Sequence, residues 1–113
     1  MEDLHQLTKR SRREIEVHTP AVVLESANPY FLENASVLLA CLRLWLQDHD
    51  RPDQAVREIL STHDVAALQD AVRELRDRGN PEAQEASQLI AGIVGMPERD
   101  RQWIVSHACL VFR

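Results

Sequence analysis

An apolar stripe that begins at Asn28-Pro29 constrains the fold more than any other feature of the sequence. Its residues recur at steps of three and four, and Leu32, Leu39 and Leu46 flank them. The stripe consists of Phe31, Ala35, Leu38, Leu42 and Trp45. This spacing predicts an α-helix with a wide buried face. An asparagine caps a free N–H and a following proline has none to lose, so the helix is expected to begin here and to be central.

Four further helices are predicted by similar start and stop signals. They cover about residues 52–60, 64–78, 80–94 and 97–111. Gly79 is expected to close the second of them in a left-handed conformation. The chain has three glycines, and β-branched residues rarely alternate with polar ones, which argues against a sheet. We therefore predict an all-α fold, a compact bundle of five to six helices joined by short loops.

The N-terminal part of the chain has a thinner apolar pattern. Leu4, Leu7 and Ile15 lie at roughly helical spacing and predict a weak helix over residues 1–17. Residues 18–27 contain Thr19-Pro20 and read as a connector that docks on the body. The division expected is a linker with a weak helix and connector at 1–27, followed by one domain at 28–113.

Charge and hydropathy limit the classes of partner. The formal net charge is −5, whereas proteins that bind nucleic acid usually carry a basic patch. The one basic run, Lys9 to Arg13, reads as solvated, with contact to nucleic acid or anionic lipid left open. No signal peptide is evident, and the longest apolar stretch, 37–46, is too short for a bilayer. These features predict a cytoplasmic protein or a soluble piece of a larger one.

A search for catalytic and metal-binding patterns finds none. His107 and Cys109 are the closest pair of potential metal ligands, and a helix points them to different faces. The sequence has no glycine-rich phosphate loop, nucleophile elbow or H-E-x-x-H motif. We expect no cofactor, no metal and no enzyme activity of the chain itself. Cys41 and Cys109 read as buried free thiols, and a disulfide between their helices remains open.

Two features suggest contact with a partner protein. Asp48, Asp50 and Asp53 cluster around the loop after the central helix, and Glu58 lies a little over one turn further on. Helix capping explains one or two of these carboxylates, and an acidic rim that receives a basic partner explains the rest. Tyr30 is the other candidate, because exposed tyrosines are favoured at interfaces. The alternative interpretations are that Tyr30 packs against the fold and that the carboxylates lie on solvated helix faces.

Three segments carry a resemblance to a known family. The run from Asn28-Pro29-Tyr30-Phe31 to Leu42 resembles the start of the all-alpha domain inserted in type IV secretion coupling ATPases, the TraG/TraD-like proteins. Residues 54–60 and 98–106 resemble later helices of that domain, in the same order. Phe31 stands where the family often has tryptophan. The phosphate-binding loop, the acidic metal-binding strand and the membrane helices of those ATPases are absent.

The resemblance implies a receptor role over residues 28–113. The chain would be an excised, monomeric domain on the cytoplasmic side of an ATPase anchored in the inner membrane. It would bind secretion signals of effectors or relaxases for delivery to the channel. The alternatives are a freestanding helical regulator or immunity-type protein that binds a partner enzyme, a DNA-processing accessory protein using Lys9 to Arg13, and last an enzyme.

Overall fold

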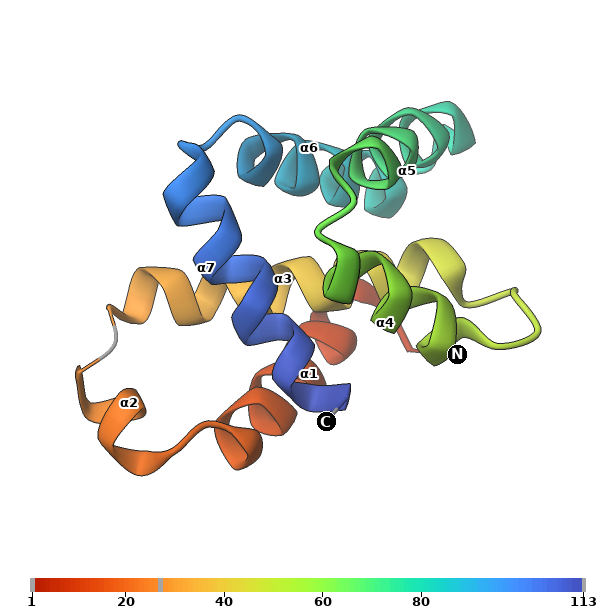
Figure 1. Cartoon of the computed structure of the whole chain (residues 1–113). Coiled ribbons are helices and arrows are strands. Elements are labelled where there is room, and N and C mark those ends of the chain that lie inside the picture. Colours follow the sequence, from red (N-terminus) through yellow and green to blue (C-terminus); the bar gives the residue numbers. More distant parts are fainter. Residues whose placement is uncertain (1, 27, 113) are drawn as a thin grey trace.

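Helix α3 (Pro29–Leu46) is the central element of the computed structural model, which describes residues 2–26 and 28–112. Every other long helix contacts it directly or through one neighbour (Figure 1). The remaining elements are α1 (Leu4–His18), α2 (Ala21–Ser26), α4 (Pro52–Thr62), α5 (Val65–Arg78), α6 (Pro81–Val94), α7 (Glu98–Cys109) and a 3-10 turn (Leu110–Phe112). The described residues contain no strand, and the all-α prediction is confirmed.

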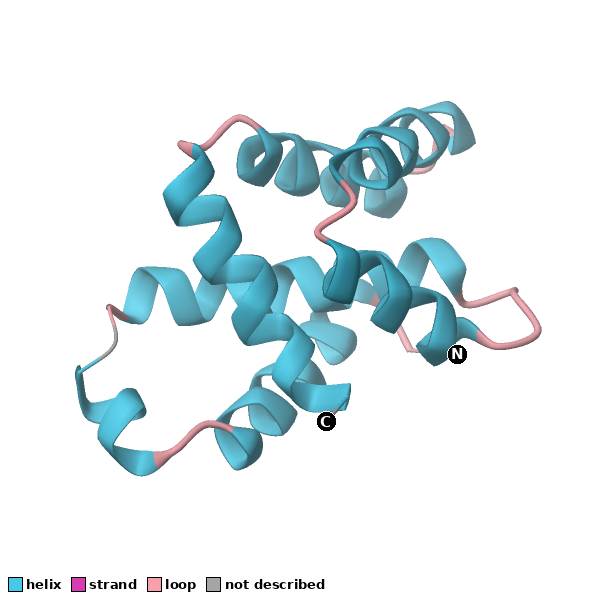
Figure 2. Ribbon diagram, in the orientation of Figure 1, coloured by secondary structure: helices cyan, strands magenta, loops and turns pink. Residues whose placement is uncertain are grey.

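The helices surround α3 in a simple arrangement. Helix α1 packs along one side of it, and α7 crosses it with α4 alongside (Figure 1). Helices α5 and α6 pack against each other as a hairpin, and α6 also leans on α3. The connections are short, as predicted (Figure 2). No helix among the described residues is both long enough and apolar enough to cross a bilayer.

The helix starts follow the local capping chemistry read from the sequence. The side chain of Asn28 accepts a hydrogen bond from the Tyr30 N–H at 2.9 Å, which confirms the start of α3. Asn80 accepts from the Ala83 N–H at 2.8 Å at the start of α6. Gly79 closes α5 with a φ of 76°, the left-handed conformation predicted for it.

Helix α1 differs from the expectation of a weak or frayed element. It is 15 residues long, and Asp3 and Gln6 form a capping box at its start. Leu4, Leu7 and Ile15 are buried against α3, and the backbone N–H of Leu4 donates to the Glu82 carboxylate of α6 at 3.1 Å. The first helix is thus part of the core. The domain division at residue 28 stays a prediction, which is taken up in the Discussion.

The connector forms helix α2, which does not dock as expected. None of its side chains is buried, and Val22 is 71% exposed. It lies at the edge of the molecule, after the buried Thr19 (Figure 1). Helix α2 therefore adds no buried side chain to the core, in contrast to α1.

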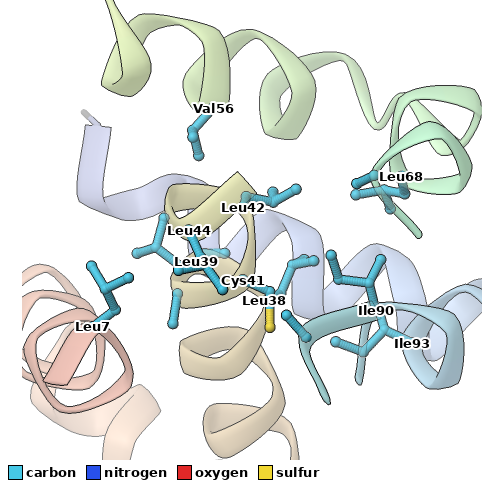
Figure 3. Packing of buried hydrophobic residues seen from close by; sticks show 14 of the residues in the cluster. Leu7, Leu38, Leu39, Cys41, Leu42, Leu44, Val56, Leu68, Ile90 and Ile93 are labelled. Carbon is cyan, nitrogen blue, oxygen red and sulfur yellow. The ribbon is translucent and has the colours of Figure 1, made fainter. Parts of the chain in front are cut away.

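Most of the core is formed by leucine and isoleucine side chains that meet around α3. Figure 3 shows Leu7 of α1, Val56 of α4 and Leu68 of α5 approaching the central helix from different sides. The α6 side chains that complete this group are Ile90 and Ile93. Contacts from five helices to one explain why α3 is apolar nearly all round.

One charged side chain lies inside this apolar setting. Arg43 of α3 is only 6% exposed. Its guanidinium donates to the Ser11 hydroxyl at 3.1 Å and to the Glu14 carboxylate at 2.7 Å, both on α1. It also lies 5.8 Å from the centre of the Phe112 ring. Arg43 therefore ties α1 and the C-terminal turn to the central helix.

Candidate protein-binding site

The four predicted acidic residues lie around the start of α4. Asp48 and Asp50 are in the loop after α3, Asp53 is in the first turn of α4, and Glu58 is in its middle. All four side chains are exposed. Residues 47–64 hold five carboxylates against two arginines, so this segment contributes much of the chain's net negative charge. The structure thus places all four carboxylates on the surface, and of these four Glu58 alone lines the hollow described next.

A shallow hollow lies beside Glu58, between the end of α3, helix α4 and the start of α5. We call it the acidic hollow. It is lined by Leu46, His49, Ala55, Glu58, Ile59, Thr62 and Asp64. We refer to its apolar residues, Leu46, Ala55 and Ile59, as the floor and to the exposed Glu58 and Asp64 as the edge. An apolar floor with charged edges is typical of a surface that receives a side chain of a partner.

Sequence reasoning missed this floor, although a signal for it exists. Ala55, Glu58, Ile59 and Thr62 are spaced i, i+3, i+4 and i+7, which places them on one face of α4. Ala55 and Ile59 are both half-buried. Asp64 also caps α5, because its carboxylate accepts a hydrogen bond from the Ala67 N–H at 3.0 Å.

Asp53 has an internal partner in addition to its place on the rim. Its carboxylate lies 3.7 Å from Nε of the buried Arg43. The side chain remains 70% exposed, so the contact is partly screened by water. Among the predicted acidic residues, Asp53 is therefore the one linked to the interior of the fold.

Tyr30 lies far from the acidic residues. It is eighteen positions before Asp48, at the other end of α3, which corresponds to about 27 Å along the helix axis. The two ends of α3 lie on opposite sides of the molecule in Figure 1. The structure thus divides the predicted binding residues into two separate regions.

Tyr30 begins a row of four rings between α3 and α7. Its ring centre is 5.7 Å from that of Phe31, which is 5.2 Å from Trp103. Trp103 in turn stacks on His107 at 3.8 Å. Tyr30 is 57% exposed and the other three rings are half-buried. Of the two adjacent aromatics at the start of α3, Phe31 thus packs while Tyr30 stays exposed.

The Nε2 atom of His107 is buried without a hydrogen-bond partner among the described residues. Burial lowers the pKa of His107 below its ordinary value. The imidazole of His107 therefore binds a proton more readily in the unfolded chain than in the folded one. The free energy of unfolding should then fall as the pH drops from about 6.5 toward the pKa of His107 in the folded chain. We expect His107→Gln to reduce that fall. Urea unfolding of both proteins across this window measures the difference, and parallel profiles would contradict it.

Two of the four cationic side chains in the basic run of α1 form ion pairs. Arg10 pairs with Glu2 at 2.8 Å and lies 3.4 Å from Glu14. Arg12 contacts Glu16 and Glu33, each at 3.2 Å. These pairs neutralise half of the cationic side chains in the run. The structure therefore supports a phosphate-binding surface less than the sequence from Lys9 to Arg13 does by itself.

The described residues bring no three His, Cys, Asp or Glu side chains together around a point. Cys41 and Cys109 are both free. Burial, with a smaller contribution from the Glu85 carboxylate, raises the pKa of the Cys41 thiol to about 12. That thiol is therefore protonated at neutral pH and is not a thiolate nucleophile.

One serine–histidine contact bridges α4 and α7. Ser106 Oγ lies 3.4 Å from Nε2 of His63, which ends α4 with a φ of 50°. Among the described residues, no carboxylate is hydrogen-bonded to the other ring nitrogen of His63. A catalytic triad needs such a group to orient the imidazole. The Ser106–His63 pair thus lacks the third group of a triad, and the acidic hollow is the stronger candidate site.

No protein-family model, no curated protein and no solved structure matches this chain.

Proposed function

We propose that this chain is a protein-binding domain that receives secretion signals, as the substrate-receptor domain of a type IV secretion coupling protein. Its partners would be signal segments of effectors or relaxases, and the parent ATPase core would lie on the cytoplasmic side of the inner membrane. The resemblance over residues 28–113 motivates this assignment. The observation that carries it is the acidic hollow, with its apolar floor next to free carboxylates.

The hollow suits an unstructured segment better than a rigid protein surface. It is shallow and open, and its edge is formed by side chains of one helix and one loop. A flexible segment can place one side chain on the floor while its backbone follows α4. Such segments pay an ordering cost on binding, which favours modest affinity and ready release to the next component.

Titration of the isotope-labelled domain with C-terminal signal segments tests this proposal. Segments from proteins encoded beside the same secretion locus should cause localised, saturable NMR shifts. We expect these shifts at Glu58, Ile59 and Asp64, and not at Leu89 on α6, which is exposed elsewhere. Unchanged spectra with every segment, from a folded domain, would refute the receptor function.

A freestanding regulator or immunity-type protein is the second candidate, and one observation favours it. Helix α1 is capped, buried and bonded to both α3 and α6, rather than a loose linker. A chain whose first helix completes its own core resembles an independent protein more than an excised insertion. Stable folding together with no response to signal segments would favour this candidate.

A further inference from the structure

We infer that the acidic hollow binds a segment in which an apolar side chain has a lysine or arginine close by in the sequence. This inference rests on the proposed function, because it specifies the chemistry of the segment that the domain receives. Three features of the hollow support it: its floor, its carboxylates and the end of α4.

The floor provides a place for one apolar side chain. Ala55 and Ile59 are half-buried, and Leu46 is buried beneath them. Exposure of this apolar surface to water is unfavourable, so covering it with an apolar side chain of a partner is favoured. The floor is small, and it therefore fits a single anchor residue rather than a whole helix face.

The carboxylates at the edge are available to an incoming cation. Glu58 forms no ion pair with any described residue. Asp64 uses Oδ1 for the helix cap, so its other oxygen can bind a cation without loss of the cap. Arg57 is adjacent to Glu58 in the sequence but lines a different hollow, beside Ser106.

The last turn of α4 has no basic residue, so no cation of the helix itself offsets the partial negative charge of this end. Its last carbonyl groups accept hydrogen bonds from the chain itself: Thr62 Oγ1 donates to the Glu58 carbonyl at 2.8 Å, and the Asp64 N–H donates to the Ile59 carbonyl at 3.1 Å. Two other helix ends have a guanidinium, since Arg78 donates to the Trp45 carbonyl of α3 at 2.7 Å and Arg101 to the Val94 carbonyl of α6 at 3.3 Å. A partner's cation near the end of α4 would therefore add a favourable charge interaction rather than fill a missing hydrogen bond.

Short capped peptides of defined sequence test this inference. The first has one leucine flanked by two arginines in a neutral background, the second replaces arginine with citrulline, and the third replaces leucine with serine. We expect saturable shifts around the hollow with the first peptide only. Raising the salt concentration from ~50 mM to ~300 mM should weaken that binding, because exposed ion pairs are screened.

A double variant, Glu58→Gln with Asp64→Asn, removes both charges while asparagine keeps the cap. We expect it to bind the arginine peptide roughly tenfold more weakly. Glu85→Gln on α6 removes one charge outside the hollow and should bind within about twofold of the parent. Thermal unfolding of all variants shows that the fold is retained.

Equal binding of the arginine and citrulline peptides, or parent-like binding by the double variant, would overturn the inference. The receptor function can fail separately. Signal segments that bind outside the hollow would leave the receptor function in place and refute this chemistry. Binding of the arginine peptide without binding of any signal segment would support this chemistry and refute the receptor function.

Discussion

Removal of residues 1–27 is expected to abolish cooperative folding of the remaining helices. Leu4, Leu7 and Ile15 are almost fully buried against the rest of the core. Each such side chain contributes about 1.5–3 kcal/mol, so the loss is about 5–9 kcal/mol. Domains of this size are stable by about 5–15 kcal/mol in total. Urea unfolding of the fragment, followed by circular dichroism, should show a broad transition or none.

This experiment also tests the predicted domain division. A fragment 28–113 that unfolds in one sharp transition would establish the boundary at residue 28 and contradict a structural role for α1. Two point variants within the full chain serve as matched controls. Ile15→Ala should cost about 2–5 kcal/mol. Val17→Ala, two positions away and 80% exposed, should change stability by less than about 0.5 kcal/mol.

Replacement of Arg43 by alanine is expected to cost about 3 kcal/mol of stability. The change removes the closer of the two cationic partners of Glu14, leaving Arg10 at 3.4 Å, and it removes the hydrogen bond to Ser11. Breaking a fully buried ion pair costs about 3–5 kcal/mol. The lower value applies here because the Glu14 side chain is 28% exposed and water compensates part of its lost contact. Chemical unfolding of the variant measures the effect.

A double variant separates the cost of leaving a buried charge unpaired from the cost of lost side-chain packing. Arg43→Met with Glu14→Met replaces the pair by apolar side chains of similar length. Such replacements are often neutral or stabilising, so the double variant should be far closer to the parent than Arg43→Ala is. Arg57→Ala on the exposed face of α4 is the control and should change little. A double variant as unstable as Arg43→Ala would show that the ion pair itself is required.

Helix α1 shows why its strength was underestimated from the sequence. Its buried positions are Leu4, Leu7, Ser11 and Ile15, a regular stripe at steps of three and four. Serine at the third position interrupts the apolar pattern, so the stripe looked thin. Ser11 is buried because its hydroxyl accepts a hydrogen bond from Arg43, 32 residues away. A polar contact between two helices cannot be read from the periodicity of either one.

The acidic hollow was predicted in part for a similar reason. The acidic residues around the start of α4 are close together in the sequence, and all of them are exposed in the fold. The floor of the acidic hollow depends on how α4 leans toward the end of α3 and the start of α5. The same packing brings Asp53 within reach of Arg43.

The sequence by itself determined helices α3 to α7 and the best defined of their ends. The caps at Asn28 and Asn80 and the left-handed Gly79 involve groups no more than a few residues apart, and their chemistry acts before any tertiary contact forms. Tertiary structure alone decided that Arg43 is buried, that α1 completes the core and that α2 does not. These outcomes depend on distant side chains that meet only after the helices pack, because a polar group is tolerated inside only where its partner is also present.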